Sequence, residues 1–387
     1  MSSLHHGILP PEIWLEVFAH LEGRSYYTPW HTPPFQPTPC VASEGNVGSA
    51  YTSVVLVCRN WRSWAIGLLY RNIKVLDAAQ LKGSLDVPRA YGQWVRRAVV
   101  PYSATVTETC KPMSSTEILS LCPNLEILVR PPYVYGHSPL RGLRFDFDAS
   151  CPPLLSLKRV DWWHQWEAAR SGGINSLTSV LAAAPNLEYL FVGGVPCGPP
   201  FHGLVEHIYL PNLHTLRLSI NNAMLLHHIV HKWALPALNK LVLDSPILGV
   251  MDMLWEVLGP QLEFVEFGKH LRFLLDQALT PCLEGCPSLR EISYYLFITT
   301  APNMSPETVY PSITSIDINM SENAFLGDIQ HEWEHLERHF EGLAGDMFPN
   351  LRLLRVFSMA ERMRADDRFI LMHQRLRDRG CIVEFVE

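Results

Sequence analysis

The sequence predicts an α/β solenoid in which short parallel strands alternate with helices. The first observation is a repeated pattern: residues 235–243 contain L-x-x-L-x-L beginning at Leu238, two residues after a proline. Eight further segments repeat it, beginning at Leu125, Leu157, Leu187, Leu213, Leu262, Leu289, Ile313 and Leu351. Successive copies lie between 24 residues apart (Leu238 to Leu262) and 38 residues apart (Ile313 to Leu351). Such spacing is typical of a degenerate leucine-rich-repeat-like array.

The second observation concerns what lies within and between the repeats. The closing half of each copy alternates apolar and polar residues, which predicts a short strand with one buried face. Helical patterns separate the strands, and the early ones end before the next proline. The expected helices are 115–121, 176–184, 222–233, 248–258, 271–283, 324–342 and 366–379, with a capping strand at 95–100 and a last strand at 382–386. We expect residues 74–387 to form this solenoid, with strands on its concave side, helices on its convex side and a loop at 161–166.

The N-terminal residues predict a separate small helical module. Pro11 suits the first turn of a helix, and Ile13, Val17 and Leu21 recur at four-residue spacing on one face. A second helix is expected over 53–70. Residues 22–49 contain five prolines with several Gly, Ser and Thr, so we expect a largely disordered, exposed insert there.

These N-terminal residues resemble the F-box motif. The resemblance rests on Leu9-Pro10-Pro11-Glu12-Ile13, Val17-Phe18 and Leu21, followed by residues 56–62 (LVCRNWR) and 69–73 (LYRNI). It implies a module over residues 8–73 that binds a Skp-type adaptor and thereby joins a cullin–RING (SCF-type) ubiquitin ligase. It also implies that Leu9, Pro10, Ile13, Val17 and Phe18 contact the adaptor while Trp61 supports the core of the module. The 22–49 insert departs from the family pattern and leaves its effect on adaptor docking open.

Residues that flank the second apolar position of each strand should point away from the core. The charged and aromatic ones are candidates for binding a client protein, because aromatic anchors surrounded by charge are typical of protein interfaces. These candidates are Arg159, Tyr189, Phe191, Arg217, Lys240, Phe264, Glu266 and Glu291. The alternative is a scatter of ordinary surface residues.

One motif points to catalysis. Residues 331–335 satisfy H-E-x-x-H, and His339 lies one turn further along, an arrangement that can bind zinc. The extended form of the motif fails at Arg338 and Glu341, and a polar helix face with surface histidines explains the pattern more simply. Nucleophile-elbow and nucleotide-loop motifs do not occur, so we expect no catalytic residue, metal or cofactor.

Composition narrows the class of function further. The net charge of −7 and the lack of a basic stripe argue against a nucleic-acid partner. No apolar run reaches the length of a membrane span, and the nine cysteines lack regular spacing, so we expect a cytoplasmic or nuclear protein. The interpretation is a non-enzymatic substrate receptor in the ubiquitin-like conjugation pathway. The alternatives are an interaction scaffold unconnected to ubiquitin and, least favoured, a zinc metalloprotease.

Overall fold

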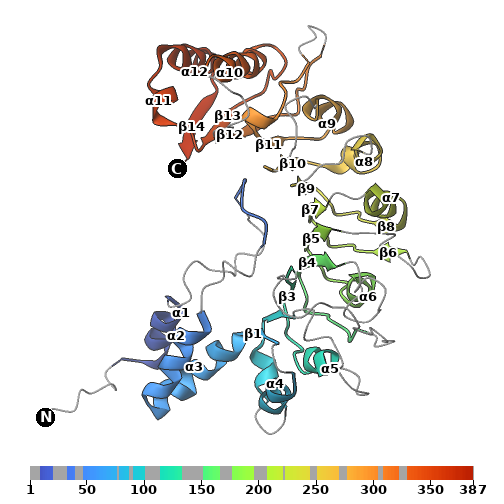
Figure 1. Ribbon diagram of the computed structural model, residues 1–387, viewed down its shortest axis with the longest axis vertical. Helices are drawn as coiled ribbons and strands as arrows, with labels where there is room; N and C mark the ends of the chain where they lie inside the picture. The colour runs from blue at the N-terminus through green and yellow to red at the C-terminus, as the bar shows by residue number, and fades with distance from the viewer. Residues whose placement is uncertain are drawn as a thin grey trace, which may run out of the picture. The chain divides into compact units, whose positions relative to one another are not determined.

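The protein is a mixed α/β chain built on parallel strands and helices. The computed structural model describes residues 9–20, 33–39, 47–75, 78–86, 90–100, 114–132, 151–165, 177–195, 207–220, 223–244, 251–269, 277–303, 308–321 and 329–386. Two compact units are present: unit 1 contains Met1–Thr32 and Pro39–Pro211, and unit 2 contains Pro33–Thr38 and Asn212–Glu387. Figure 1 gives the labels of the helices and strands.

Unit 1 begins with three helices, α1 (Pro11–Ala19), α2 (Val47–Val57) and α3 (Arg59–Arg71). The single helix predicted over 53–70 was therefore wrong, because one helix ends at Val57 and the next begins at Arg59, with Cys58 between them. That residue is extended (φ −158°, ψ 170°), and its Sγ accepts a hydrogen bond from the backbone N–H of Trp61 at 3.4 Å. Cys58 thus caps α3 in the way that short polar side chains satisfy the exposed N–H groups at a helix start.

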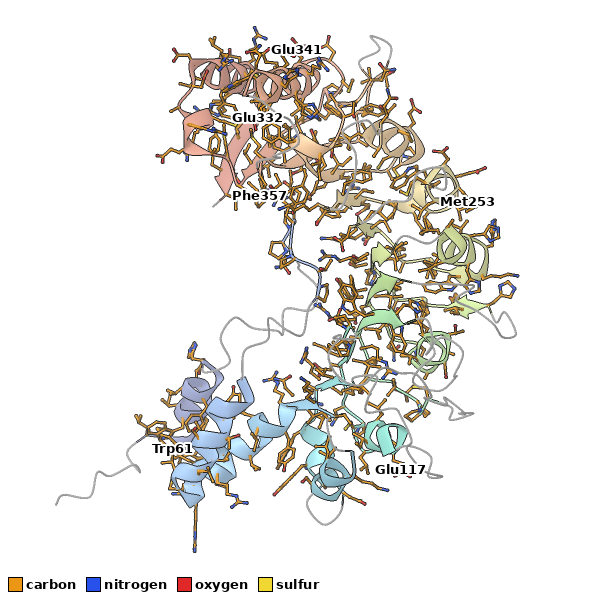
Figure 2. The ribbon with its side chains drawn as sticks, in the orientation of Figure 1. Trp61, Glu117, Met253, Glu332, Glu341 and Phe357 are labelled. Carbon is orange, nitrogen blue, oxygen red and sulfur yellow. The ribbon has the colours of Figure 1, made fainter. Side chains whose placement is uncertain are left out.

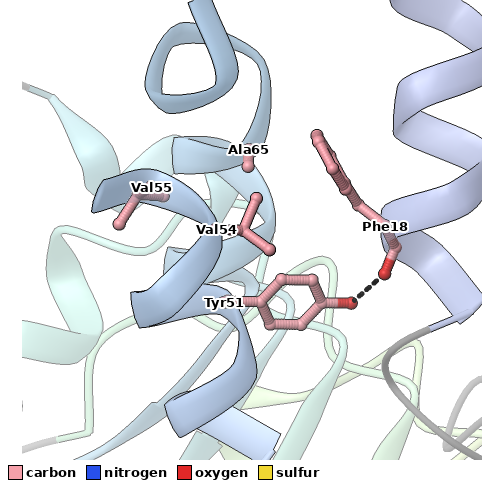
Figure 3. Packing of buried hydrophobic residues seen from close by; sticks show 5 residues of the cluster. All are labelled: Phe18, Tyr51, Val54, Val55 and Ala65. Atoms are coloured by element: carbon pink, nitrogen blue, oxygen red, sulfur yellow. Dashed lines mark hydrogen bonds between the residues drawn. The ribbon is translucent and has the colours of Figure 1, made fainter. Parts of the chain in front are cut away.

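An aromatic and aliphatic core holds the three helices together. Phe18, Tyr51, Val54, Val55 and Ala65 are buried in it (Figure 3), and the hydroxyl of Tyr51 donates to the carbonyl of Phe18 at 3.2 Å. The partly buried ring of Trp61 packs on Phe18 with 5.0 Å between centroids. Trp61 therefore packs against this core, in the role that the F-box resemblance implies for it.

The rest of unit 1 is a parallel sheet in the order β1 to β5. Its strands are β1 (Asn72–Lys74), β2 (Arg97–Val99), β3 (Ile127–Arg130), β4 (Arg159–Gln165) and β5 (Tyr189–Val195), with β6 (Ile208–Tyr209) following. Between them lie α4 (Ala78–Leu85), the 3-10 turn η3 (Tyr91–Trp94), α5 (Ser114–Ser120) and α6 (Leu177–Ala183). The loop predicted at 161–166 was wrong over 161–165, because β4 continues to Gln165 in register with β5 up to Val195.

Unit 2 is a second run of parallel strands, with helices along one face (Figure 1). The strands are β7 (Thr215–Ile220), β9 (Lys240–Leu243), β10 (Phe264–Phe267), β11 (Glu291–Tyr295), β12 (Ser315–Asn319), β13 (Leu353–Phe357) and β14 (Ile382–Val386), with β8 (Trp233–Ala234) outside this run. The helices are α7 (Ala223–Lys232), α8 (Met251–Leu258), α9 (Leu279–Gly285), α10 (Ile329–Ala344), α11 (Glu361–Arg364) and α12 (Asp367–Asp378), and η7 (Gly259–Gln261) and η8 (Leu296–Ile298) are 3-10 turns. Helix α9 is shorter than predicted, since residues 277 and 278 precede it as coil.

The repeat pattern predicted the strands correctly. In all nine copies the strand begins two residues after the leading apolar residue, as at Leu238 before β9 and Leu262 before β10. All nine leading residues are buried. Parallel register then stacks each strand residue beside its counterpart in the next copy, so that Leu241, Val265, Ile292 and Ile316 form one internal row. This buried ladder is part of the core of unit 2.

The expectation of a largely disordered insert over 22–49 was wrong for its centre, although Pro33, Gln36 and Pro37 there are exposed, as expected. Residues 33–38 pack in unit 2, and we call this segment the strap. The end of the insert also differs from the prediction, since α2 already begins at Val47. Hydrogen bonds and ring contacts hold the strap, so its ordering entropy is offset by specific interactions. Residues 22–32 and 40–46 lie outside the described residues.

Candidate functional site

An exposed apolar row runs along α1. Leu9, Ile13 and Val17 lie four residues apart, and each is 45% exposed. Pro10, also exposed, precedes the helix, and its carbonyl accepts from the N–H of Ile13 at 3.1 Å. Four of the five residues expected to contact an adaptor are therefore exposed, Leu9 and Pro10 just before the helix and Ile13 and Val17 one turn apart within it, and we call these four residues the α1 row.

Phe18, the fifth of these residues, differs from the expectation. Its side chain is 1% exposed and lies in the core between α1, α2 and α3. The reason is geometric: successive helix residues point about 100° apart, so when Val17 faces outward its neighbour turns toward α3. Phe18 supports the helix that carries the α1 row instead of contributing to its surface.

A second candidate surface lies on the face of the unit 2 sheet opposite its helices, which we call the open face. Parallel register aligns alternate residues on it into two rows. One row contains Lys240, Phe264, Glu291, Ser315 and Leu353, and the other contains Arg217, Val242, Glu266, Ser293, Asp317 and Arg355. All five client-binding candidates of unit 2 lie on this face.

Ion pairs organise the open face. Arg217 donates two hydrogen bonds of 2.8 Å to the carboxylate of Asp244, one from Nε and one from Nη2. Arg355 bonds to both oxygens of Asp317, at 2.6 and 2.9 Å, and to Glu291 at 2.6 Å. Because these groups are wholly or partly withdrawn from water, removing one partner would leave an uncompensated charge, which is costly. Fork-shaped arginine contacts also fix the positions of the carboxylates.

Glu266 is a buried carboxylate in the middle of this face. Burial raises its pKa to about 7, and the positive charges of Arg217 and Lys240 only partly oppose that effect. Lys240 is itself largely buried, which lowers its pKa, and its Nζ lies 3.9 Å from the ring centroid of Phe264. Perturbed carboxylates of this kind are frequent at functional sites.

The strap lies on the open face. In Figure 1 it is the blue segment beside β7, β9 and β10, on the side away from α7, α8 and α9. The backbone N–H of Phe35 donates to Oε1 of Glu266 at 3.1 Å, and Nη2 of Arg217 donates to the carbonyl of Gln36 at 2.8 Å. The ring of Phe35 packs edge-on against the rings of Tyr295 and Phe357, with 5.0 and 5.1 Å between ring centroids; Figure 2 labels Phe357.

The client-binding candidates of unit 1 are less accessible than expected. Tyr189 and Phe191 are buried, so neither ring is presented as a surface anchor. Arg159 lies 4.5 Å from the ring centroid of Tyr189 and pairs with Asp161 at 3.0 Å, while the ring of Trp163 packs against Phe191 at 5.2 Å. The three candidates therefore contact neighbouring side chains of unit 1, and the two rings are not available as surface anchors.

The histidines of the H-E-x-x-H motif lie on α10, where His331 is exposed, as the simpler interpretation expected. His335 is partly buried and His339, one turn beyond the motif, is buried, so these two differ from that interpretation. His339 is buried, with Nε2 2.9 Å from the carbonyl of Thr299 and Nδ1 3.2 Å from the hydroxyl of Tyr294. Nε2 of His335 lies 2.7 Å from the carbonyl of Leu296, and burial lowers the pKa of both rings, that of His339 to about 3. Within the described residues, no group of three or more His, Cys, Asp or Glu is placed to hold a metal ion.

Sequence reasoning missed three residues of the open face: Asp244, Tyr295 and Phe357. Each lies four residues beyond the first residue of its strand, one step past the end of L-x-x-L-x-L. Extending the same alternation by two residues would have found them, because side chains two apart share a face.

Comparisons with known proteins leave the family open. No protein-family model matches the sequence, and no curated protein is significantly similar to it. Among the helices of the described residues, none has the length and apolar character needed to cross a bilayer.

Proposed function

We propose that this protein is a substrate receptor of a cullin–RING ubiquitin ligase, belonging to the F-box proteins with leucine-rich-type repeats. In this proposal the α1 row binds a Skp-type adaptor, and the repeat strands form a solenoid that binds a client protein. The receptor acts by proximity, since holding a client near ligase machinery carried by other chains raises its effective concentration there. Its own residues perform no catalytic step.

The observation that carries the proposal is the α1 row itself. Leu9, Ile13 and Val17 remain nearly half exposed although the opposite side of the helix is packed into an aromatic core. Aligned apolar side chains that a small module leaves uncovered are typical of protein-binding sites. The order of the motif residues, with L-P-x-E-I before V-F and then L-V-C-R-N-W-R, supports an F-box as the module that presents them.

Capture of a Skp-type adaptor by co-expression and affinity purification tests the proposal. The combined substitution Leu9→Asp and Val17→Asp should reduce capture more than tenfold. Each side chain still has about half of its area to bury, worth roughly 1 kcal/mol, and a carboxylate placed in the interface adds a desolvation cost. A matched control is Val257→Asp in α8, a residue of similar exposure (48%), which should capture the adaptor like the wild type.

The proposal fails if the wild-type chain, monodisperse and folded by circular dichroism, captures no adaptor. A scaffold that binds proteins without any link to ubiquitin would then be favoured. The open face supports this second candidate on its own, because its charged rows and aromatic residues do not depend on the α1 row.

A further inference from the structure

The strap is held mainly through its backbone. Glu266 accepts from the N–H of Phe35, while Arg217 donates to the carbonyl of Gln36 at 2.8 Å and to that of Pro37 at 3.5 Å. Arg217 and Glu266 are both buried and lie in the same row of the open face, two strands apart. Backbone contacts of this kind recognise the path of a chain and tolerate many side chains.

One side chain of the strap has a dedicated slot. Tyr295 and Phe357 both pack edge-to-face with the Phe35 ring, at interplanar angles of 74° and 70°. The register of the sheet places Asn319 between these two residues, so the slot spans β11, β12 and β13. Edge-to-face packing with two rings suits a flat aromatic ring and gives the site its selectivity.

The conformation of the strap is that of a bound turn. Phe35 has φ 62°, in the left-handed region that non-glycine residues seldom adopt, and prolines lie on both sides of it at positions 33, 34 and 37. A strained residue persists only where its surroundings determine its conformation. The flanking prolines reduce the entropy lost on binding, because their φ angles are already fixed.

The contacts of the strap are not those of a structural core segment. Pro33, Gln36 and Pro37 are exposed, and Phe35 is only half-buried. The core of unit 2 is the internal row of leucine, valine and isoleucine side chains, which lies on the other face of the strands. The open face therefore holds the strap as a site holds a peptide.

We propose that the open face of unit 2 is a peptide-binding site for an aromatic residue flanked by prolines, and that the strap occupies this site in cis. A client carrying such a turn would compete with the strap for Arg217, Glu266 and the aromatic slot. That such a peptide belongs to a client rests on the proposed function. Peptide binding to the open face does not, and it can be tested without any adaptor.

The test uses the full chain with residues 33–38 replaced by six alternating glycines and serines. The probe is a fluorescein-labelled peptide of residues 33–39, Pro-Pro-Phe-Gln-Pro-Thr-Pro, and the readout is fluorescence anisotropy. The peptide should bind the replaced chain saturably and the wild type at least tenfold more weakly. A peptide with alanine in place of the phenylalanine should bind at least tenfold more weakly than the probe.

Two matched substitutions in the replaced chain locate the site. Arg217→Lys keeps the charge beside Asp244 but loses the planar fork that reaches the two carbonyls, so binding should weaken at least tenfold. Arg290→Lys, on an exposed arginine of the same unit, should leave binding unchanged.

Several outcomes would overturn the proposal. Short tethers give effective concentrations of about 1 mM, so a strap that fills its site must bind more tightly than that; no saturable binding to the folded replaced chain at 1 mM peptide would exclude the site. Equal peptide binding to the wild type and to the replaced chain would exclude occupation in cis. A wild type that is dimeric, and becomes monomeric when residues 33–38 are replaced, would also exclude it, because the strap would then occupy the site of a second copy. Loss of cooperative unfolding in the replaced chain would make the strap a structural part of unit 2. None of these results involves the adaptor, so they are separable from failure of the α1 row.

Discussion

The buried carboxylate of Glu266 makes the stability of unit 2 depend on pH in an unusual direction. Its pKa rises from an ordinary value of 4.5 to about 7 in the folded state, chiefly through burial, while Arg217, Lys240 and the N–H of Phe35 oppose the rise and Asp244 adds to it. Between pH 4.5 and 7 the folded chain therefore retains a proton that the unfolded chain has released. Linkage then requires the free energy of unfolding to fall as pH rises through this window.

The magnitude follows from the difference between the two pKa values. Each tenfold change in proton affinity is worth about 1.4 kcal/mol, so the loss between pH 4.5 and 8 is roughly 3 kcal/mol. Glu266→Gln cannot ionise, and its amide oxygen can still accept from the N–H of Phe35. We expect the free energy of unfolding of this variant, relative to the wild type, to increase by roughly 3 kcal/mol between pH 4.5 and 8.

Urea unfolding followed by circular dichroism at several pH values measures this difference, and hydrogen exchange of β9, β10 and β11 assigns it to unit 2. Glu284→Gln, an exposed glutamate on α9, controls for the removal of one carboxylate. Subtracting the wild type removes the contributions of other groups whose pKa values change on folding, including Glu291 and His339. A difference that stays constant across the range would refute the reasoning, since it would mean that folding does not perturb Glu266.

Three further predictions concern packing, titration and metal. Phe18→Ala should lower the free energy of unfolding of the helical module by about 3–5 kcal/mol, whereas Ile13→Ala should change it by less than about 0.5 kcal/mol; thermal unfolding that showed equal effects would contradict the packing. Burial holds the pKa of His339 at about 3, so stability should fall as pH drops below 6.5. His339→Gln should flatten that slope by about 1.4 kcal/mol per pH unit, which urea unfolding at pH 5 and 6 checks. Finally, mass spectrometry of metals in the purified protein should find no stoichiometric zinc, and one zinc per chain lost on His335→Ala would show the prediction to be wrong.

The strands of the repeats could be predicted from the sequence because each copy carries its own signal. A leading residue such as Leu262 and the alternation after it determine where a strand begins, whatever the distance to the next copy. Strand β1 and helix α4 carry no such signal, since Asn72–Lys74 is short and lacks the leucine pattern. The helix boundary at Cys58 could not be predicted for a similar reason: the helical spacing of apolar residues continues across it from Val57 to Trp61, and only the extended backbone of Cys58 separates the two helices.

The candidate sites likewise differ in whether a local sequence pattern or contacts between distant residues determine them. Helical spacing alone predicts that Ile13 and Val17 of the α1 row share a face. His339 could have been assigned to the core, because it lies three residues after the buried Leu336 on α10. The strap could not have been found in this way. Phe35 and Glu266 are 231 residues apart, and Gln36 and Arg217 are 181 apart. Composition alone indicated an unstructured loop, whereas the contacts that order it come from distant repeats.

Because the strap is joined to the chain at both ends, it would set a minimum affinity that any peptide competing for the open face must exceed. A segment that fills its site 99% of the time weakens the apparent affinity of a competitor about 100-fold, since only the vacant fraction can bind. Weak, abundant turns that resemble the strap would then be rejected. A client that contacts a further part of the receptor at the same time would still bind, because the second contact supplies the missing affinity. The six residues that fill the site would in this way set how strong a client must be before it is admitted.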